Sequence, residues 1–190
     1  MSGADPNPHT GLLVASPQML DPNFARTVVL LCDFNEEGAL GIVVNRTIDV
    51  EIGEVLRQME VSEETSGISG PVLWGGPVQP GAVFLTFAGE TPHTAEETPV
   101  FTLSAGLHVS PARDVIEAVA RNEAVDAFIS LGYAGWAAGQ LDVEIAEGSW
   151  IFLDVDPDVV FTIPPNKRYD YCLSTLGISP HLLWMQPVNE

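Results

Sequence analysis

Basic residues are scarce in this sequence. Seven Lys and Arg side chains stand against 26 Asp and Glu in 190 residues, which makes an acidic protein with a formal net charge of −19. Proteins that bind DNA or RNA directly gain much of their affinity from Lys and Arg contacts with phosphates. We therefore expect no direct binding of nucleic acid, and the same negative field disfavours anionic membranes. A basic protein partner or a cation is electrostatically compatible with this charge.

Long apolar runs and a targeting segment are also missing. No run approaches the roughly 20 apolar residues that cross a bilayer, although 46% of the residues are hydrophobic. Residues 1–10 lack the basic start and the apolar core of a secretory signal. We expect a cytoplasmic protein with a flexible N-terminal tail over residues 1–10 and a single domain over residues 11–190.

The motifs of common catalytic and metal sites are absent as well. Cys32 and Cys172 are far apart, and the four histidines share no metal-ligand spacing. The sequence contains neither a G-x-S-x-G nucleophile motif nor the two common phosphate-binding fingerprints. The D-x-D-x-D run at residues 154–158 opens like a calcium loop, but Val159 and Pro165 stand where such a loop needs Gly and Glu. We expect no metal site and no cofactor.

The residues that are present predict a mixed α/β domain rich in strands. Apolar runs bounded by turn residues predict strands at residues 11–15, 27–33, 40–44, 71–74, 81–87, 100–103, 125–131 and 150–155. A period of 3.6 residues predicts helices at residues 51–59, 111–119, 140–147 and 169–176. Asp49 is the expected N-cap of the first helix, and Ser110, followed by Pro111, is that of the second. The turn residues at 35–38 pair the second and third strands as an antiparallel hairpin.

The most distinctive stretch is GYAGWAAGQL at residues 132–141. Its three glycines allow positive φ and close backbone approach, and Tyr133 and Trp136 bring flat, half-polar rings. We interpret the stretch as a tight turn before the helix of residues 140–147, whose free N–H groups would face a small pocket. The alternative is a well-packed corner in which both aromatic side chains belong to the core.

A second group of candidates combines a glycine turn with the scarce cations. The turn at Gly75-Gly76 suggests a close approach of the backbone to another group. We expect Arg26 and Arg46 near each other at one sheet edge, where they form, with the Asn45 amide, a positive spot suited to a carboxylate or phosphate. The alternative is that each arginine forms an ordinary ion pair with a neighbouring acid such as Asp21.

Several of these segments, taken in order, resemble the YqgE/AlgH family of bacterial proteins. They are LLVASP at residues 12–17, DPNF at 21–24, RTV at 26–28, GALG at 38–41, NR at 45–46, GGPV at 75–78, and GYAGW at 132–136 with GQL at 139–141. The resemblance covers nearly the whole chain, from Gly11 to about Leu176. It implies an α+β fold in which a mostly antiparallel, bifurcated sheet rolls into a pseudo-barrel with flanking helices. The family has no established activity, and the AlgH name implies a link to transcriptional regulation through a proposed role in alginate production.

We expect a candidate cleft where the glycine turns and the positive spot meet, which binds a small anionic ligand or a protein partner without converting it. Its residues are Asp21, Arg26, Asn45, Arg46, Gly75, Gly76, Tyr133, Trp136 and Gln140. The negative charge indicates that any regulatory role in transcription is indirect. The alternative is an enzyme that acts on a small anionic metabolite, with Arg26 or Arg46 as the anion clamp and Asp21 or Glu144 as the acid/base group.

Overall fold

The computed structural model describes residues 9–61, 67–93, 98–122 and 125–179. Its strands are β1 (Gly11–Ala15), β2 (Val28–Asn35), β3 (Gly38–Val43), β4 (Leu73–Trp74), β5 (Val78–Ala88), β6 (Phe101–Thr102), β7 (Leu107–Ser110), β8 (Ala127–Ala137) and β9 (Trp150–Leu153). Its helices are α1 (Ile52–Gln58), α2 (Arg113–Ala120), α3 (Gln140–Ala146) and α4 (Pro165–Thr175), with a 3₁₀ turn η2 (Ser104–Gly106) and a π-helix η3 (Asp158–Thr162). The predicted N-terminal tail lies outside the described residues except for His9 and the buried Thr10.

The strands form one sheet that divides at β8. The strand order is β6-β7-β5-β8-β3-β2-β1-β9, and β4 pairs with β8 beside this path. The first part of β8, up to Tyr133, pairs with β4 and β5, whereas Ala134 to Ala137 pair with β3. Gly132 lies at this change of partner with a φ of +76°, a conformation that favours glycine. Among the strand pairs of the described residues, only the short pairing of β4 with β8 is parallel, so the mostly antiparallel, bifurcated sheet is confirmed.

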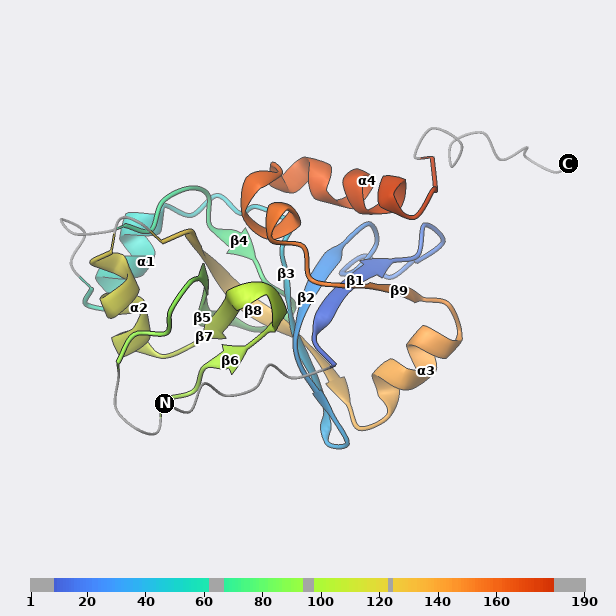
Figure 1. Ribbon diagram of the computed structural model, residues 1–190, viewed down its shortest axis with the longest axis horizontal. Helices are drawn as coiled ribbons and strands as arrows, with labels where there is room; N and C mark the ends of the chain where they lie inside the picture. The colour runs from blue at the N-terminus through green and yellow to red at the C-terminus, as the bar shows by residue number, and fades with distance from the viewer. Residues whose placement is uncertain (1–8, 62–66, 94–97, 123–124, 180–190) are drawn as a thin grey trace, which may run out of the picture.

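The divided sheet rolls up on itself. β6 lies at one end of the strand order, yet it contacts β2, which lies near the other end. Figure 1 shows the strands crossing at the centre of the molecule, with α1 and α2 at one end, α3 at the other and α4 above. The predicted pseudo-barrel with flanking helices is therefore confirmed. Among the described residues, no helix is long and apolar enough to cross a membrane.

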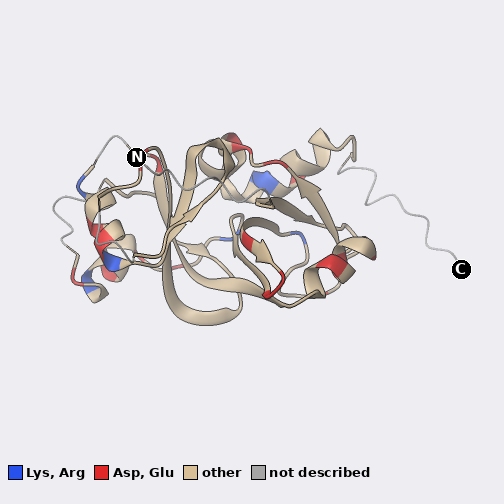
Figure 2. Cartoon of the chain, turned by 60° about the horizontal axis from the view of Figure 1, so that its bottom comes forward, with Lys and Arg blue, Asp and Glu red and all other residues tan. Residues whose placement is uncertain are grey.

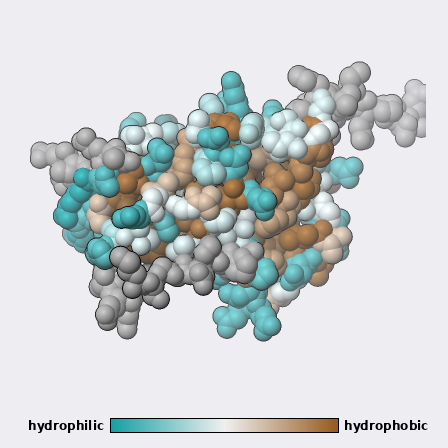
Figure 3. All heavy atoms as spheres, viewed as in Figure 1, coloured by the Kyte–Doolittle hydropathy of each residue, from teal (hydrophilic) through white to brown (hydrophobic). Residues whose placement is uncertain are grey.

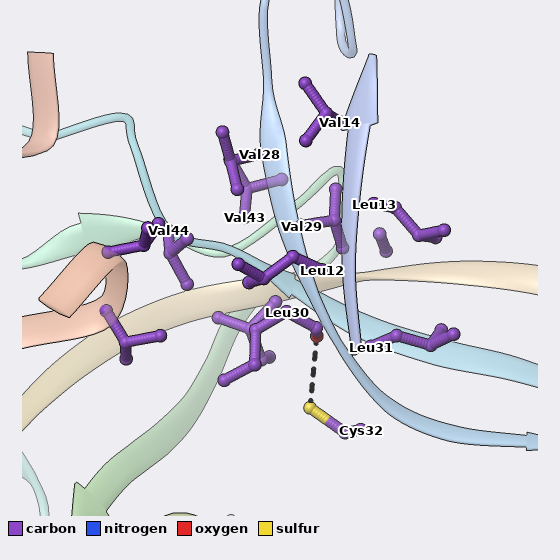
Figure 4. Close-up of a cluster of buried hydrophobic side chains, with 14 of the residues drawn as sticks. Leu12, Leu13, Val14, Val28, Val29, Leu30, Leu31, Cys32, Val43 and Val44 are labelled. Carbon is purple, nitrogen blue, oxygen red and sulfur yellow. Dashed lines mark hydrogen bonds between the residues drawn. The ribbon is translucent and has the colours of Figure 1, made fainter. Parts of the chain in front are cut away.

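Two apolar cores stabilise the fold. In the larger core, all five residues of β1 and the first five of β2 are buried, because both faces of these strands are covered. Figure 4 shows Leu12, Leu30 and Leu31 in this core, with the Cys32 thiol donating to the Leu30 carbonyl over 3.3 Å. The smaller core lies where α1 and α2 pack on the sheet, and its central members are Val55, Leu56, Leu85, Phe87, Val115, Ile116 and Ile129.

The expected helix starts are wrong for the first two helices. The residue at the N-cap of α1 is Glu51 rather than Asp49, and its side chain makes no capping hydrogen bond. Ser110 ends β7, and α2 starts only at Arg113. The Ser110 hydroxyl donates to the Pro99 carbonyl and accepts the N–H of Ala112. Ser110, which the local pattern predicts as a helix cap, therefore belongs to β7, because strand pairing overrides the local preference.

The glycine-rich stretch is mostly strand, so the expected tight turn over its whole length is wrong. β8 continues through Gly135 and Trp136 to Ala137, and the turn is confined to residues 138–139. The strand continues because β3 pairs with this part of the stretch. The expected helix over residues 140–147 is confirmed as α3, with Gly139 at a φ of +73° before it. At the other end of the chain, α4 starts at Pro165, ahead of the apolar pattern that begins at Tyr169.

Candidate functional site

The nine candidate residues lie at three different places in the fold. Asp21, Trp136 and Gln140 line a groove beside α3. Gly75, Gly76 and Tyr133 lie where the segment between β4 and β5 crosses β8. Arg26, Asn45 and Arg46 lie at the loop of residues 21–26. The structure thus brings only part of the predicted cleft together.

The two glycine turns do meet, but each approaches the backbone of the other. A Cβ atom on Gly75 would lie 2.2 Å from the carbonyl oxygen of Gly132, and one on Gly76 would lie 2.1 Å from the carbonyl carbon of Tyr133. The Gly75 N–H donates to the Leu131 carbonyl over 2.8 Å. The glycines therefore allow the segment between β4 and β5 to cross β8 at the division of the sheet.

Arg46 holds the loop of residues 21–26 in place. Its guanidinium donates to the carbonyls of Asn23 at 2.7 Å and Ala25 at 2.8 Å, and more weakly to that of Pro22. Its guanidinium carbon lies 5.2 Å from the centre of the Trp74 ring. Burial lowers the pKa of Arg46, and the nearby charge of Asp21 opposes that shift. Arg46 is thus engaged with the protein itself.

Asn45 and Arg26 fix the other end of the same loop. The Asn45 amide donates to the Arg26 carbonyl and accepts the Val28 N–H, each over 2.8 Å. The Arg26 side chain forms an ion pair with Asp170 of α4 over 3.1 Å, and it lies over the Tyr169 ring. Arg26 precedes β2 and Arg46 follows β3, so both lie at the open end of the β2–β3 hairpin, whose strands are interior to the sheet. The acid that pairs with Arg26 comes from a distant part of the chain.

The groove beside α3 has a volume of about 310 Å³. We call it the Glu144 groove, and its lining residues are Met19, Asp21, Phe24, Gly135, Trp136, Gln140, Glu144, Glu147, Ser149 and Trp150. They come from the loop before β2, the end of β8, α3 and the start of β9. The short turn at residues 138–139 and the short connection from α3 to β9 bring the last three of these elements together.

Glu144 is the best-positioned polar side chain of this groove. One carboxylate oxygen, Oε2, accepts the indole N–H groups of Trp136 at 2.8 Å and Trp150 at 2.9 Å. The other, Oε1, accepts the side-chain amide of Gln140 at 2.9 Å, and the Gln140 carbonyl oxygen in turn accepts the N–H of Ala137. A carboxylate has about four acceptor positions, so these three donors leave one open on Oε1.

Three aromatic rings pack around this carboxylate. Phe24 stacks on Trp136 with ring centres 6.2 Å apart, and it meets Trp150 edge to face at 5.6 Å. The two indole rings meet edge to face at 5.8 Å. Such pairs favour one arrangement over others, and the Trp136 and Trp150 side chains are buried. The groove therefore combines packed aromatic side chains with a carboxylate that hydrogen bonds hold in position.

The charges that line the groove are all negative. Asp21, Glu144 and Glu147 contribute carboxylates, and none of the lining residues is Lys or Arg. Figure 2 shows the acidic positions in red along α3. Aromatic faces and carboxylates both attract cations, so this lining favours a cationic group over an anionic one. Among the described residues, no group of three or more His, Cys, Asp or Glu side chains is arranged to hold a metal ion.

The sequence did not identify Phe24, Glu147 and Trp150 as members of a site. Trp150 follows Glu144 by six residues and Phe24 lies in a separate loop, so no local spacing connects them. The sequence offers Glu144 only as an acid/base group in the enzymatic alternative. The hydrogen bonds of Glu144 with Trp136 and Trp150 depend on the turn between β8 and α3, so they are tertiary contacts that no local pattern predicts.

Comparisons with known proteins agree with the fold and identify the family. The sequence model of the AlgH-like family matches residues 12–181. The UPF0301 protein RSc0675 of Ralstonia nicotianae is 39% identical over 173 residues, which cover 90% of this chain and 89% of that protein. The UPF0301 protein PBPRA3139 of Photobacterium profundum is 38% identical over 174 residues, which cover 88% and 91%.

Two solved structures have the same fold. The solution structure of the AlgH protein from Pseudomonas aeruginosa matches with a TM-score of 0.70 and 32% identity, and the match covers 100% of both chains. The crystal structure of protein DIP2367 from Corynebacterium diphtheriae matches with a TM-score of 0.70 over 99% of this chain and 91% of that one. Its 22% identity supports the fold alone. From the family match, the identities and the shared fold, the chain belongs to the AlgH-like family.

Proposed function

We propose that this protein is a non-enzymatic binding protein, and that its Glu144 groove accepts a Lys or Arg side chain from a basic segment of a protein partner. The observation that carries the proposal is the Glu144 carboxylate, held by Trp136, Trp150 and Gln140 inside an open, aromatic and acidic groove. A guanidinium or ammonium group could bind the open acceptor position of Oε1 and contact the aromatic rings.

The charge of the whole chain supports a basic partner. A net charge of −19 accelerates the approach of a positively charged segment and opposes that of a polyanion. In this proposal, a regulatory effect on transcription passes through the protein partner in the cytoplasm and not through contact with DNA. The expected small anionic ligand does not suit this groove, because its lining carries carboxylates and no cation.

The surface next to the groove supports a partner larger than a single amine. Val143 of α3 is 55% exposed and Phe152 of β9 is 42% exposed. On the face shown in Figure 3, brown apolar side chains reach the surface on the side where α3 and β9 lie. Val143 lies four residues before Glu147, which places both on one side of the helix. A basic segment with an apolar residue could use both contacts.

The enzymatic alternative receives less support from this geometry. Asp21 and Glu144 line the same groove, as that alternative requires. However, Arg46 donates to backbone carbonyls and Arg26 pairs with Asp170, and neither arginine lines the groove. The proposed acid/base groups therefore lie together without an anion clamp beside them.

The test is a tryptophan-fluorescence titration with a blocked pentapeptide of alternating glycine and arginine, because Trp136 and Trp150 line the groove. The matched ligand has glutamine in place of arginine. We expect the arginine peptide to bind at least about tenfold more tightly, and to weaken as salt is raised. Methylammonium that binds as tightly as the peptide would instead indicate a small amine as the natural occupant.

Two double variants distinguish binding in the groove from a general attraction of the peptide to the negative charge of the protein. Asp21→Asn with Glu147→Gln removes two exposed carboxylates from the lining. Glu51→Gln with Glu54→Gln removes the same charge at α1, at the opposite end of the molecule (Figure 1). We expect the first pair to weaken binding at least about tenfold and the second to leave it within about twofold. Equal losses in both pairs would refute the groove as the binding site.

A further inference from the structure

A second cavity lies at the first turn of α4. It has a volume of about 360 Å³ and is lined by residues 69–71, the start of β8, the π-helix η3 and the start of α4. It shares no lining residue with the Glu144 groove. We call it the Arg168 cavity, because a buried arginine is among its lining residues.

Arg168 is a charged side chain in an almost fully buried position. The residue is only 4% exposed, and it donates from Nε to the Ile163 carbonyl at 2.8 Å and from Nη1 to the Val44 carbonyl at 2.6 Å. A guanidinium has five N–H donors, so these two bonds leave three unused. Figure 2 shows blue positions near the start of α4, where Lys167 precedes Arg168.

The charge of Arg168 has no ion-pair partner within the described part of the chain. The bonds above join it to neutral carbonyls. Burial lowers the pKa of Arg168 to about 10, so the guanidinium stays protonated at neutral pH. Asp126 also lines the cavity, at an exposed position. A buried charge without a partner is costly, and an anion in the cavity would remove that cost.

We infer that the Arg168 cavity binds a small anion, a carboxylate or a phosphate, whose negative group pairs with the unused N–H donors of Arg168. The rest of the cavity suits a compact organic body, since Leu73, Phe128, Phe161 and Ile163 line it. The π-helix that forms one wall is a rare element that often accompanies functional sites. This site is independent of the proposed function of the Glu144 groove.

A structural role for Arg168 makes a different prediction. The bonds from Arg168 to Ile163 and Val44 link α4 to the end of β3, and that link alone would stabilise the fold without any ligand. If Arg168 had only this structural role, small anions would not change the thermal stability of the protein. Ligand-dependent stability therefore distinguishes the two roles, whereas the effect of a substitution on stability alone does not.

The probes are benzoate, its neutral isostere benzamide, and inorganic phosphate, each added to the full chain in a thermal-unfolding assay. At about a hundredfold excess over its dissociation constant, a bound anion raises Tm by about 5–11 °C for a chain of this size. We expect benzoate or phosphate to give such a shift and benzamide to give none. A response to benzoate indicates a carboxylate site, and one to phosphate alone indicates a phosphate site.

Two variants decide whether the shift comes from this cavity. Arg168→Gln removes the charge, and Ser69→Trp places a large ring at an exposed lining position and keeps Arg168. Arg113→Gln, an exposed arginine outside the lining, is the matched control. We expect the first two variants to lose at least nine-tenths of the anion-induced shift and the control to keep it. If Arg168→Gln fails to fold, the Ser69→Trp variant still tests whether the shift comes from this cavity. Absence of any anion shift in the unmodified chain, or a shift that survives both variants, would overturn the inference.

Discussion

Gly75 and Gly132 approach each other so closely that a Cβ atom on Gly75 would lie 2.2 Å from the Gly132 carbonyl oxygen. The contact joins the segment before β5 to the strand on which the sheet divides. Two backbones at this distance cannot move apart without breaking the hydrogen bond from the Gly75 N–H to the Leu131 carbonyl. The division of the sheet therefore depends on residues without side chains at this crossing.

Substituting Gly75 by Ala should destabilise the fold strongly. Because the clash is with backbone atoms, we expect a loss of about 3 kcal/mol in the free energy of unfolding, at the upper end of overpacking effects. Urea denaturation measures it. Gly81→Ala in β5 is the control, since a Cβ there meets nothing within 4 Å, and its effect should stay within about 1 kcal/mol. Equal losses at the two sites would contradict the proposed crossing.

Substituting Glu144 by Ala should destabilise the protein even without a ligand. The change leaves the indole N–H groups of Trp136 and Trp150 without their acceptor, and both side chains are buried. A buried unsatisfied donor costs about 1–3 kcal/mol, so we expect a loss of about 2–6 kcal/mol for the pair. Urea denaturation followed by tryptophan fluorescence measures the loss. Glu147→Ala is the control on the same helix, and a comparable loss there would argue against the indole bonds as the cause.

Substituting Arg46 by Ala should loosen the loop that carries Asp21 and Phe24 into the groove. The loop loses its bonds from Arg46 to the carbonyls of Asn23 and Ala25. We expect a destabilisation of about 1–3 kcal/mol and faster amide hydrogen exchange in residues 21–26, which mass spectrometry can localise. Arg121→Ala, which breaks an exposed pair with Glu117, should cost under about 1 kcal/mol and leave the exchange of this loop unchanged.

The stability of the protein should decrease as the pH is lowered, because His108 becomes protonated. Burial lowers the pKa of this imidazole below its ordinary 6.5, with a smaller opposing effect from its hydrogen bond to the Gly89 carbonyl. The unfolded chain therefore binds the proton more readily than the folded chain, and the contribution of His108 is lost as pH falls below about 6.5. Urea denaturation from about pH 7.5 to 5.5 should show a smaller loss for His108→Gln than for the unmodified chain. Equal losses would exclude His108 as the cause.

The two cysteines should be unreactive in the folded protein. Burial raises the pKa of the Cys172 thiol to about 11 and that of the Cys32 thiol still higher. Both cysteines are at most 2% exposed. Little thiolate therefore forms at neutral pH, and a reagent cannot reach the sulfur atoms. A thiol-specific reagent at neutral pH should react over hours in buffer and within minutes in denaturant. Rapid reaction of either thiol in the folded protein would show that its part of the core opens.

Much of the architecture follows from local patterns in the sequence. The continuous apolar runs at residues 11–15 and 27–33 correspond to β1 and β2, which are buried on both faces. The turn residues at 35–38 give the hairpin of β2 and β3, and the helical period at residues 51–59 gives α1. These patterns act over a few residues, where propensity and burial agree. The family resemblance added the division and rolling of the sheet, which no local pattern contains.

Charge is the functional property that the sequence determines by itself. A total of 26 acidic against seven basic residues disfavours nucleic-acid binding wherever the chain places them. Which groups are left for a ligand is decided by tertiary structure. Arg46 is a plausible anion ligand in the sequence, but the fold directs its donors to the loop of residues 21–26. Glycines that suggest ligand approach instead meet the glycines of another segment.

The two proposed sites follow from the tertiary structure alone. Glu144 lies between Trp136 and Trp150 because a two-residue turn and a short helix bring the end of β8 and the start of β9 together. Arg168 is buried, with no ion-paired acid among the residues that the structure describes, where α4 meets the end of β3, far from it in sequence. Hydrogen bonds and desolvation depend on distances between atoms in space, whereas the sequence specifies only distances along the chain. The sequence therefore determines the charge and most of the strands and helices, and the packing of distant segments decides which charges are satisfied and which remain for a partner.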